Sequence, residues 1–273
     1  MGQEVRIIHP KPVIDFTLVD SPAITITEGA TFDRPGIPWH NDNEETIYLM
    51  SAKVTDLVRK SPLINQPWNM LDIGCYAAHY PDFLITNGFN NIPRYIGVDF
   101  DRAALNRAGS DAQTIFKDST CRESSFFERD IFKNGSFSEI PGDNNFIVCT
   151  GVVNKQTYQD LKYLFNNVNL LMQKGATSRF FINFATFNRE IPAHYDEEKT
   201  YLVEGEHNEL GITCINCLFP TRDPNELSRS VAYDEKELEA LIRSAGFQID
   251  EISTFRTDRK VRFGNVVYGL QIA

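Results

Sequence analysis

Residues 71–80 read Leu-Asp-Ile-Gly-Cys-Tyr-Ala-Ala-His-Tyr, and residues 95–99 read Tyr-Ile-Gly-Val-Asp. Each stretch begins as a short apolar strand. The first strand ends in an Asp-x-Gly turn formed by Asp72 and Gly74, and the second ends on the carboxylate of Asp99. A glycine turn lets bare backbone approach a ligand, and an acid at the end of the following strand binds ribose hydroxyls. Together the two stretches predict a nucleoside-binding strand–helix–strand unit.

The chain around this unit alternates between strands and helices from Trp68 onward. Apolar runs predict strands at 69–74, 94–99, 126–130, 145–150, 178–186, 247–255 and 264–272. Amphipathic spacing predicts helices at 44–60, 156–173 and 234–244. This alternation is typical of an α/β protein with a doubly wound, mostly parallel sheet. Only a short turn region separates the last two strands, which predicts an antiparallel pair at the C-terminus.

These motifs resemble those of class I S-adenosylmethionine (SAM)-dependent methyltransferases over residues 44–273. The resemblance implies a Rossmann-like, seven-stranded sheet with an antiparallel C-terminal strand pair. It divides the chain into an N-terminal cap segment and helix, a SAM-binding core in two pieces, and an inserted lid or substrate wall. These parts are expected at 1–60, at 61–186 with 229–273, and at 187–228, respectively.

The resemblance also implies cofactor contacts at the ends of successive strands. The carboxylate of Asp99 is expected to bind the ribose, and Phe100 to stack on adenine. Asp130 is expected to bind the adenine amino group, although a solvated turn aspartate is an alternative, and Asp101 is favoured as a helix N-cap. The loop at Thr150 is expected to run under the methionine part of the cofactor. The expected cofactor-binding residues are Asp72, Gly74, Cys75, Tyr76, Asp99, Phe100, Asp130, Ile131, Thr150 and Gly151.

One departure from the family concerns the first turn, where the usual pattern has three alternating glycines. Tyr76 and Ala78 stand where the second and third glycines would be. A nicotinamide-dependent oxidoreductase would need Gly-x-Gly-x-x-Gly after the same strand, which this turn matches less well. Because the second and third glycines are missing, two alternatives to a methyltransferase stay open. They are an NAD(P)-dependent oxidoreductase and a non-catalytic SAM-fold subunit that binds a partner.

Candidates for acceptor chemistry lie in the segments flanking the core. His40, His194 and Tyr195 are the expected catalytic residues, because a histidine can take a proton from the acceptor near neutral pH. Each is also compatible with a structural role. No metal site is expected, because the fourth strand ends in Cys149-Thr150-Gly151, without the carboxylate that metal-dependent relatives place there. Cys214 and Cys217 lack a second ligand pair and read as ordinary thiols.

Composition narrows the substrate class and the location. The formal net charge is −10 without a cluster of Lys and Arg, which argues against a nucleic-acid partner. The apolar runs are too short to span a membrane, and the N-terminus lacks the apolar region of a secretory signal. Five cysteines at irregular spacing indicate reduced thiols, so a cytoplasmic protein is expected. The sequence thus predicts metal-independent methyl transfer from SAM to a small-molecule or peptide-like acceptor, and leaves the oligomeric state open.

Overall fold

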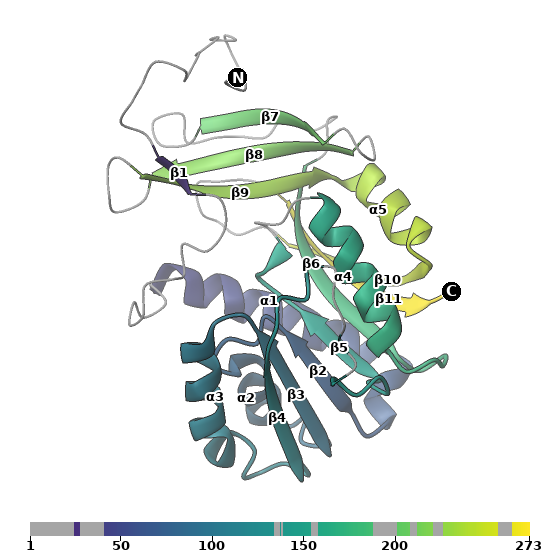
Figure 1. Cartoon of the computed structure of the whole chain (residues 1–273). Coiled ribbons are helices and arrows are strands. Elements are labelled where there is room, and N and C mark those ends of the chain that lie inside the picture. Colours follow the sequence, from purple (N-terminus) through teal and green to yellow (C-terminus); the bar gives the residue numbers. More distant parts are fainter. Residues whose placement is uncertain are drawn as a thin grey trace.

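The computed structural model describes residues 25–27, 41–133, 137, 139–153, 158–187, 201–207, 212–220, 226–255 and 264–273. Its core is a sheet with the strand order β4-β3-β2-β5-β6-β11-β10, in which the first five strands are parallel and β11 is antiparallel to both neighbours (Figure 1). The predicted seven-stranded layout is therefore confirmed. The strands are β2 (Asn69–Ile73), β3 (Arg94–Asp99), β4 (Glu123–Glu128), β5 (Phe146–Cys149), β6 (Arg179–Phe187), β10 (Phe247–Phe255) and β11 (Gly264–Ile272).

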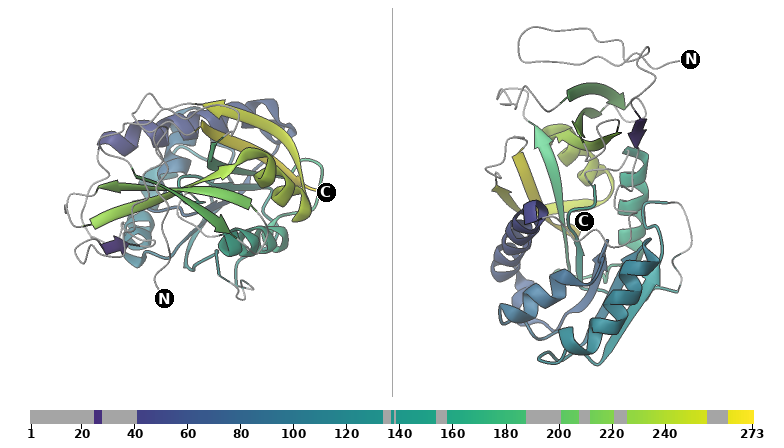
Figure 2. Two further views of the ribbon diagram at one scale, coloured as in Figure 1. Left: turned by 90° about the horizontal axis from the view of Figure 1, so that it is seen from above. Right: turned by 90° about the vertical axis from the view of Figure 1, so that its left-hand side faces the viewer.

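Helices cover both faces of this sheet. One apolar cluster joins α1 (Asn41–Lys60), α2 (His79–Thr86) and α3 (Arg102–Ile115) to one face, and a second joins α4 (Tyr158–Leu171) and α5 (Glu235–Ser244) to the other. The right-hand view of Figure 2 shows α1 and α4 on opposite sides of β6. A short 3-10 helix, η2 (Pro62–Asn65), links α1 to β2. The three predicted helices agree with α1, α4 and α5 within three residues at each end.

The third parallel strand lies earlier in the chain than the predicted run 126–130. β4 pairs with β3 from Glu123 opposite Arg94 to Glu128 opposite Asp99. Its first half is polar and exposed, because β4 is the outer strand of the sheet and only part of it packs against a helix. Apolar content located Phe126 and Phe127 but not the polar residues that complete the edge strand.

The segment between β6 and α5 extends the same sheet. It forms β7 (Tyr201–His207), β8 (Ile212–Pro220) and β9 (Glu226–Asp234), paired antiparallel in that order. The end of β9 pairs with Thr186 and Phe187 of β6, beyond the point where β5 ends. A short strand from the N-terminal segment, β1 (Thr25–Thr27), pairs with the start of β9. Figure 1 shows β1, β7, β8 and β9 together at the top of the molecule. The expected insertion boundary at 228 falls inside β9.

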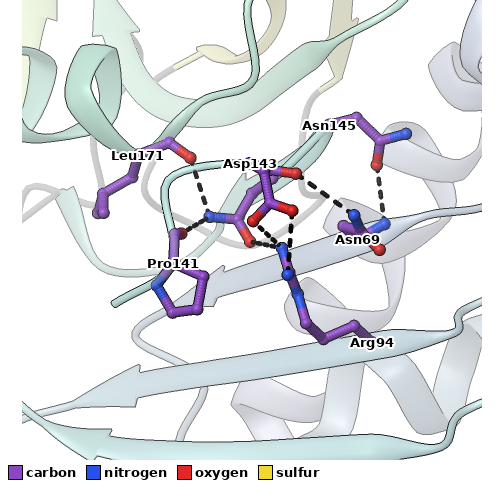
Figure 3. A network of polar contacts seen from close by, with 7 residues as sticks. Asn69, Arg94, Pro141, Asp143, Asn145 and Leu171 are labelled. Atoms are coloured by element: carbon purple, nitrogen blue, oxygen red, sulfur yellow. Dashed lines mark hydrogen bonds and ion pairs between the residues drawn. The ribbon is translucent and has the colours of Figure 1, made fainter. Parts of the chain in front are cut away.

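A polar network ties together the amino ends of the parallel strands (Figure 3). Arg94, the first residue of β3, forms an ion pair with Asp143, and its guanidinium also donates to Asn144 Oδ1 at 3.3 Å. The backbone N–H of Asn69, the first residue of β2, donates to Asn145 Oδ1 at 2.8 Å. These contacts hold the edge of the sheet opposite to the carboxyl ends, where open α/β sheets bind their ligands.

Candidate functional site

The turn after β2 brings three strand ends together. The backbone N–H groups of Gly74 and Cys75 donate to the Val98 carbonyl at 2.8 and 3.2 Å, which holds the turn against the end of β3. Gly74 has a φ of 72°, and a Cβ there would overlap Val152 Cγ2 in the loop after β5. Only glycine combines this backbone conformation with this close approach. The ends of β2, β3 and β5 therefore converge at Gly74.

The same turn keeps a glycine-like backbone at two residues that are not glycine. Tyr76 and Ala78 have φ angles of 46° and 58°, in the left-handed region. Each such residue costs about 1–2 kcal/mol relative to a right-handed conformation. Hydrogen bonds hold the turn, from the Tyr76 N–H to Asp99 Oδ2 at 2.9 Å and from the Ala78 N–H to the Cys75 carbonyl at 2.8 Å. The turn therefore keeps the left-handed backbone that glycine would favour at the second and third positions of the motif, although Tyr76 and Ala78 stand there.

Asp99 is fixed at the end of β3 by backbone donors on both sides. Its Oδ2 accepts the N–H of Tyr76 at 2.9 Å, and its Oδ1 accepts the N–H of Asp101 at 3.0 Å. Burial raises the pKa of Asp99, and these backbone donors act in the opposite direction. Each carboxylate oxygen has a further lone pair for a ligand hydroxyl. Next to it, Phe100 is 48% exposed, which leaves its ring available to a flat ligand.

Asp101 begins α3. Its Oδ1 accepts the N–H groups of Ala103 and Ala104 at 2.8 and 3.2 Å. This geometry confirms the predicted N-cap. The two neighbouring acids thus differ in role, because the Asp101 carboxylate completes the helix whereas that of Asp99 faces the turn after β2.

Asp72 is a second buried carboxylate in the same site. It is 3% exposed, and the Tyr95 hydroxyl donates to its Oδ2 at 3.0 Å. The pKa of Asp72 is raised to about 7, chiefly because burial disfavours the charged carboxylate; the Tyr95 hydrogen bond lowers the pKa, and the negative charge of Asp99 adds to the rise. None of the Lys, Arg or His side chains in the described ranges forms an ion pair with either acid. Such a pair of carboxylates favours a ligand that carries positive charge.

The buried thiol beside these acids is held neutral. Burial and the charges of Asp72 and Asp99 raise the pKa of Cys75 far above its ordinary value. Its Sγ lies close to Gly97 of β3, where an added Cβ would approach it to 2.8 Å. Cys75 therefore packs the floor of the site and does not offer a thiolate.

Asp130 and Ile131 follow β4. Asp130 Oδ1 accepts the Phe132 N–H at 3.1 Å, and its Oδ2 lies 3.1 Å from Lys133 Nζ. The Ile131 carbonyl accepts a hydrogen bond of 2.8 Å from Asn167 Nδ2 on α4, and its side chain is buried. These contacts give Asp130 a role within its own turn, so adenine binding by Asp130 and Ile131 stays a prediction.

The loop after β5 carries Thr150 and Gly151, both half-buried. Gly151 has a φ of 76°, and its N–H donates to Asn183 Oδ1 at 2.7 Å. Asn183 is fully buried on β6 and was missed by the sequence analysis. The signal was a single polar residue inside the apolar run 180–185. The roles of Tyr95 and Asn167, which donate hydrogen bonds to Asp72 and to the Ile131 carbonyl, were also missed, because their partners are distant in the sequence.

The structure thus gathers the ten expected cofactor-binding residues at the carboxyl ends of β2, β3, β4 and β5. The expected catalytic residues His40, His194 and Tyr195 lie outside the described residues. Another histidine, His79, begins α2 beside Tyr76, with 5.7 Å between ring centroids.

Across the described ranges, no three His, Cys, Asp or Glu side chains are grouped so that they could hold a metal ion. Within the same ranges, no helix has the length and apolar character needed to cross a bilayer.

No protein-family model matches the sequence, and no curated protein is similar to it. Several solved structures are similar in fold. The glycopeptide N-methyltransferase MtfA, complexed with sinefungin, has a TM-score of 0.55 at 10% identity, over 82% of this chain and 94% of that chain. Magnesium protoporphyrin IX methyltransferase from Synechocystis PCC 6803, with bound SAM, has a TM-score of 0.53 at 15% identity, over 89% and 92%. A SAM-dependent methyltransferase from Methanosarcina mazei has a TM-score of 0.52 at 17% identity, over 77% and 94%.

The chain has the class I SAM-dependent methyltransferase fold. In this methyltransferase fold the strand order reverses between β2 and β5, which are neighbours in the sheet. Open α/β sheets bind ligands in the crevice outside the carboxyl ends at such a switch point. Gly74 and Val152, which come from the loops after β2 and β5, meet at this point. The site formed by Gly74 and Asp99 therefore lies where the methyltransferase fold is expected to bind a ligand.

Proposed function

We propose that the protein is a metal-independent SAM-dependent methyltransferase that acts on an oxygen or nitrogen of a small-molecule or peptide-like acceptor. The observation that carries this proposal is the arrangement at the switch point. There the bare turn at Gly74 lies beside the carboxylate of Asp99, which two backbone N–H groups hold in place. Structures of the same fold that contain SAM, S-adenosylhomocysteine (SAH) or sinefungin support the choice of cofactor.

The described residues suit the parts of this cofactor. Asp99 would accept the ribose hydroxyls, and Phe100 would cover the adenine. The buried carboxylates of Asp72 and Asp99 have no cationic partner in the described part of the chain, so they favour a cationic ligand over a neutral one. When bound, SAM supplies an activated methyl group on a sulfonium. The contribution of the protein is to position the reactants in a cleft from which water is excluded.

We propose that the N-terminal segment 1–43 and the insertion 187–228 enclose the methyl acceptor. Two observations support this placement. β1 of the N-terminal segment pairs with β9 of the insertion, so both segments contribute to one sheet. The Tyr233 hydroxyl, on the part of β9 that follows the insertion, donates to the Val153 carbonyl at 3.4 Å, which joins the strand leaving the insertion to the loop that follows β5. On this proposal His40, His194 and Tyr195 act on the acceptor. We also propose that the protein is cytoplasmic, with its cysteines reduced.

Asp99→Ala tests the cofactor site. Losing hydrogen bonds to a charged group should weaken SAM and SAH binding by about 1.5–3 kcal/mol. Calorimetry would therefore show an increase in Kd of roughly 10- to 150-fold. The exposed acid Asp118 provides the matched control, because Asp118→Ala changes the net charge equally but lies away from the site. Unchanged affinity in Asp99→Ala would remove this residue from the site, and tighter binding of NAD than of SAM would favour the oxidoreductase.

His40→Ala and Tyr195→Phe test the acceptor segments. Each variant should transfer labelled methyl groups from SAM to acceptors in a cell extract more slowly than wild type, by about tenfold or more if the residue moves a proton. SAM affinity should stay near the wild-type value, because the sheet edge holds the cofactor. The assay contains EDTA, which should leave wild-type activity intact. Turnover equal to that of wild type in both variants would exclude catalytic roles for His40 and Tyr195. Loss of wild-type activity in EDTA would contradict metal independence.

A further inference from the structure

We propose that Asn183 is a positioning residue for the cofactor site. Its side chain fixes the position of the loop after β5 and, through that loop, the position of the glycine turn after β2. The inference rests on the proposed function of the same site. Asn183 follows Ile182, the residue of β6 that pairs with Cys149 at the end of β5. It therefore stands level with the loop that begins at Thr150.

Two contacts link Asn183 to the glycine turn. The first is the hydrogen bond of 2.7 Å from the Gly151 N–H to Asn183 Oδ1. It holds Gly151 at a φ of 76°, in the left-handed region. The second is the contact between the next residue, Val152, and Gly74, where Val152 Cγ2 occupies the place of a Cβ. A shift of Gly151 would therefore move Val152 and open the floor at Gly74.

The rest of the Asn183 amide makes this residue a poor choice for stability alone. Asn183 is 0% exposed, and its Nδ2 has no hydrogen-bond partner in the described part of the structure. Its partner across the sheet is Val267, and Val267 and Phe181 belong to the apolar cluster on the α1 side. A buried amide without a partner opposes folding. A leucine, which branches at Cγ as asparagine does, would avoid this penalty, and the half-buried Gly151 N–H would then be hydrated.

The decisive variant is Asn183→Leu. It should fold with a free energy of unfolding equal to or above that of wild type, because it removes the unpaired amide. It should nevertheless bind SAH at least about tenfold more weakly, because the Gly151 loop loses its anchor. Hydrogen exchange should show faster exchange of the Gly151 amide in Asn183→Leu than in wild type.

Asn183→Asp is the rescue variant, since it keeps an acceptor oxygen at the same position. It should protect the Gly151 amide and restore SAH affinity to within about threefold of wild type. Asn144→Leu is the matched control. Asn144 is also 0% exposed, but its Nδ2 donates to the Leu171 carbonyl at 2.9 Å on the opposite edge of the sheet. This control should lower stability and leave SAH affinity unchanged.

Three results would contradict the role of Asn183. SAH binding by Asn183→Leu within about twofold of wild type would overturn the proposal, as would loss of folding in that variant. Failure of Asn183→Asp to restore affinity would also count against it. If wild type itself does not bind SAH, the proposed function fails, whereas exchange of the Gly151 amide still tests the contact with Asn183.

Discussion

Asp72→Asn is expected to stabilise the protein at pH 8 and to leave its stability at pH 4 nearly unchanged. The pKa of Asp72 is about 7 in the folded protein, compared with an ordinary value of 3.8. Between these values the native state holds a proton that the unfolded chain has released. Stability therefore falls as the pH rises through this window and levels off above pH 7. The full difference between the two pKa values corresponds to a loss of about 4 kcal/mol in the free energy of unfolding.

Denaturant unfolding at pH 4, 6 and 8 measures this effect. The difference in unfolding free energy between Asp72→Asn and wild type should grow with pH and reach about 2–4 kcal/mol at pH 8. Tyr95→Phe is the matched variant, because it removes the hydroxyl that lowers the pKa of Asp72. It should make the loss of stability with rising pH larger. A difference between Asp72→Asn and wild type that is independent of pH would show that Asp72 is ionised at the same pH in both states.

The affinity of Asp72→Asn for SAM should fall at the pH where its stability rises. If the Asp72 charge serves a cationic cofactor, Asp72→Asn should bind SAM more weakly while its free energy of unfolding increases. Burying an uncompensated carboxylate at a stability cost is typical of functional sites. Calorimetry at pH 8, where the wild-type group is largely ionised, compares the two proteins. Equal SAM affinity would show that the Asp72 charge does not act on the cofactor.

Gly74→Ala is expected to lower both stability and cofactor binding. At a φ of 72° any side chain is strained, and the new Cβ would overlap Val152 Cγ2. The combined cost should be about 2–4 kcal/mol in unfolding free energy. Because relief of the overlap requires movement of the turn or of the loop after β5, SAH binding should fall as well. Unfolding and calorimetry measure the two effects separately.

Gly88→Ala separates backbone strain from the steric overlap. Gly88 has a φ of 87°, and an added Cβ there meets no atom within 4 Å. Gly88→Ala should therefore cost only about 1–2 kcal/mol and leave SAH binding intact. Adding Val152→Ala to Gly74→Ala should recover part of the loss, because Val152 Cβ itself would lie 3.3 Å from the new methyl group. If Gly74→Ala and Gly88→Ala behaved alike, the contact with Val152 would have no energetic role.

Local patterns in the sequence determined most of the core fold. Each buried strand is a short apolar run, so β2, β3, β5, β6, β10 and β11 were located within one residue at each end. Amphipathic spacing located α1, α4 and α5 for the same reason, since a helix exposes one face and buries the other. Asp101 was readable as an N-cap because capping depends on residues only two and three positions away. These features depend on neighbours along the chain.

The positions of Asp72, Gly74 and Asp99 in the site were also readable from the sequence. Each lies where an apolar strand ends, and parallel strands end at one edge of the sheet. The pairing of β9 with β6 was not readable, because nothing in the local sequence shows that the end of β6 extends past β5 and pairs with another strand at Thr186 and Phe187. Nor did the sequence show that Tyr76 and Ala78 adopt the left-handed backbone of the family glycines.

By itself, the sequence determined most strands of the core sheet, three of its helices and which acids stand at strand ends, because these depend on periodicity and on nearest neighbours. Only the tertiary structure decided which polar groups meet. The Tyr95 hydroxyl reaches Asp72 across 23 residues of chain, and the Gly151 N–H reaches Asn183 across 32. Such contacts arise when the sheet aligns separate strands and burial leaves polar atoms no water to bind. No local pattern encodes them, yet the first moderates the pKa of Asp72, which burial raises, and the second anchors the loop that packs against Gly74.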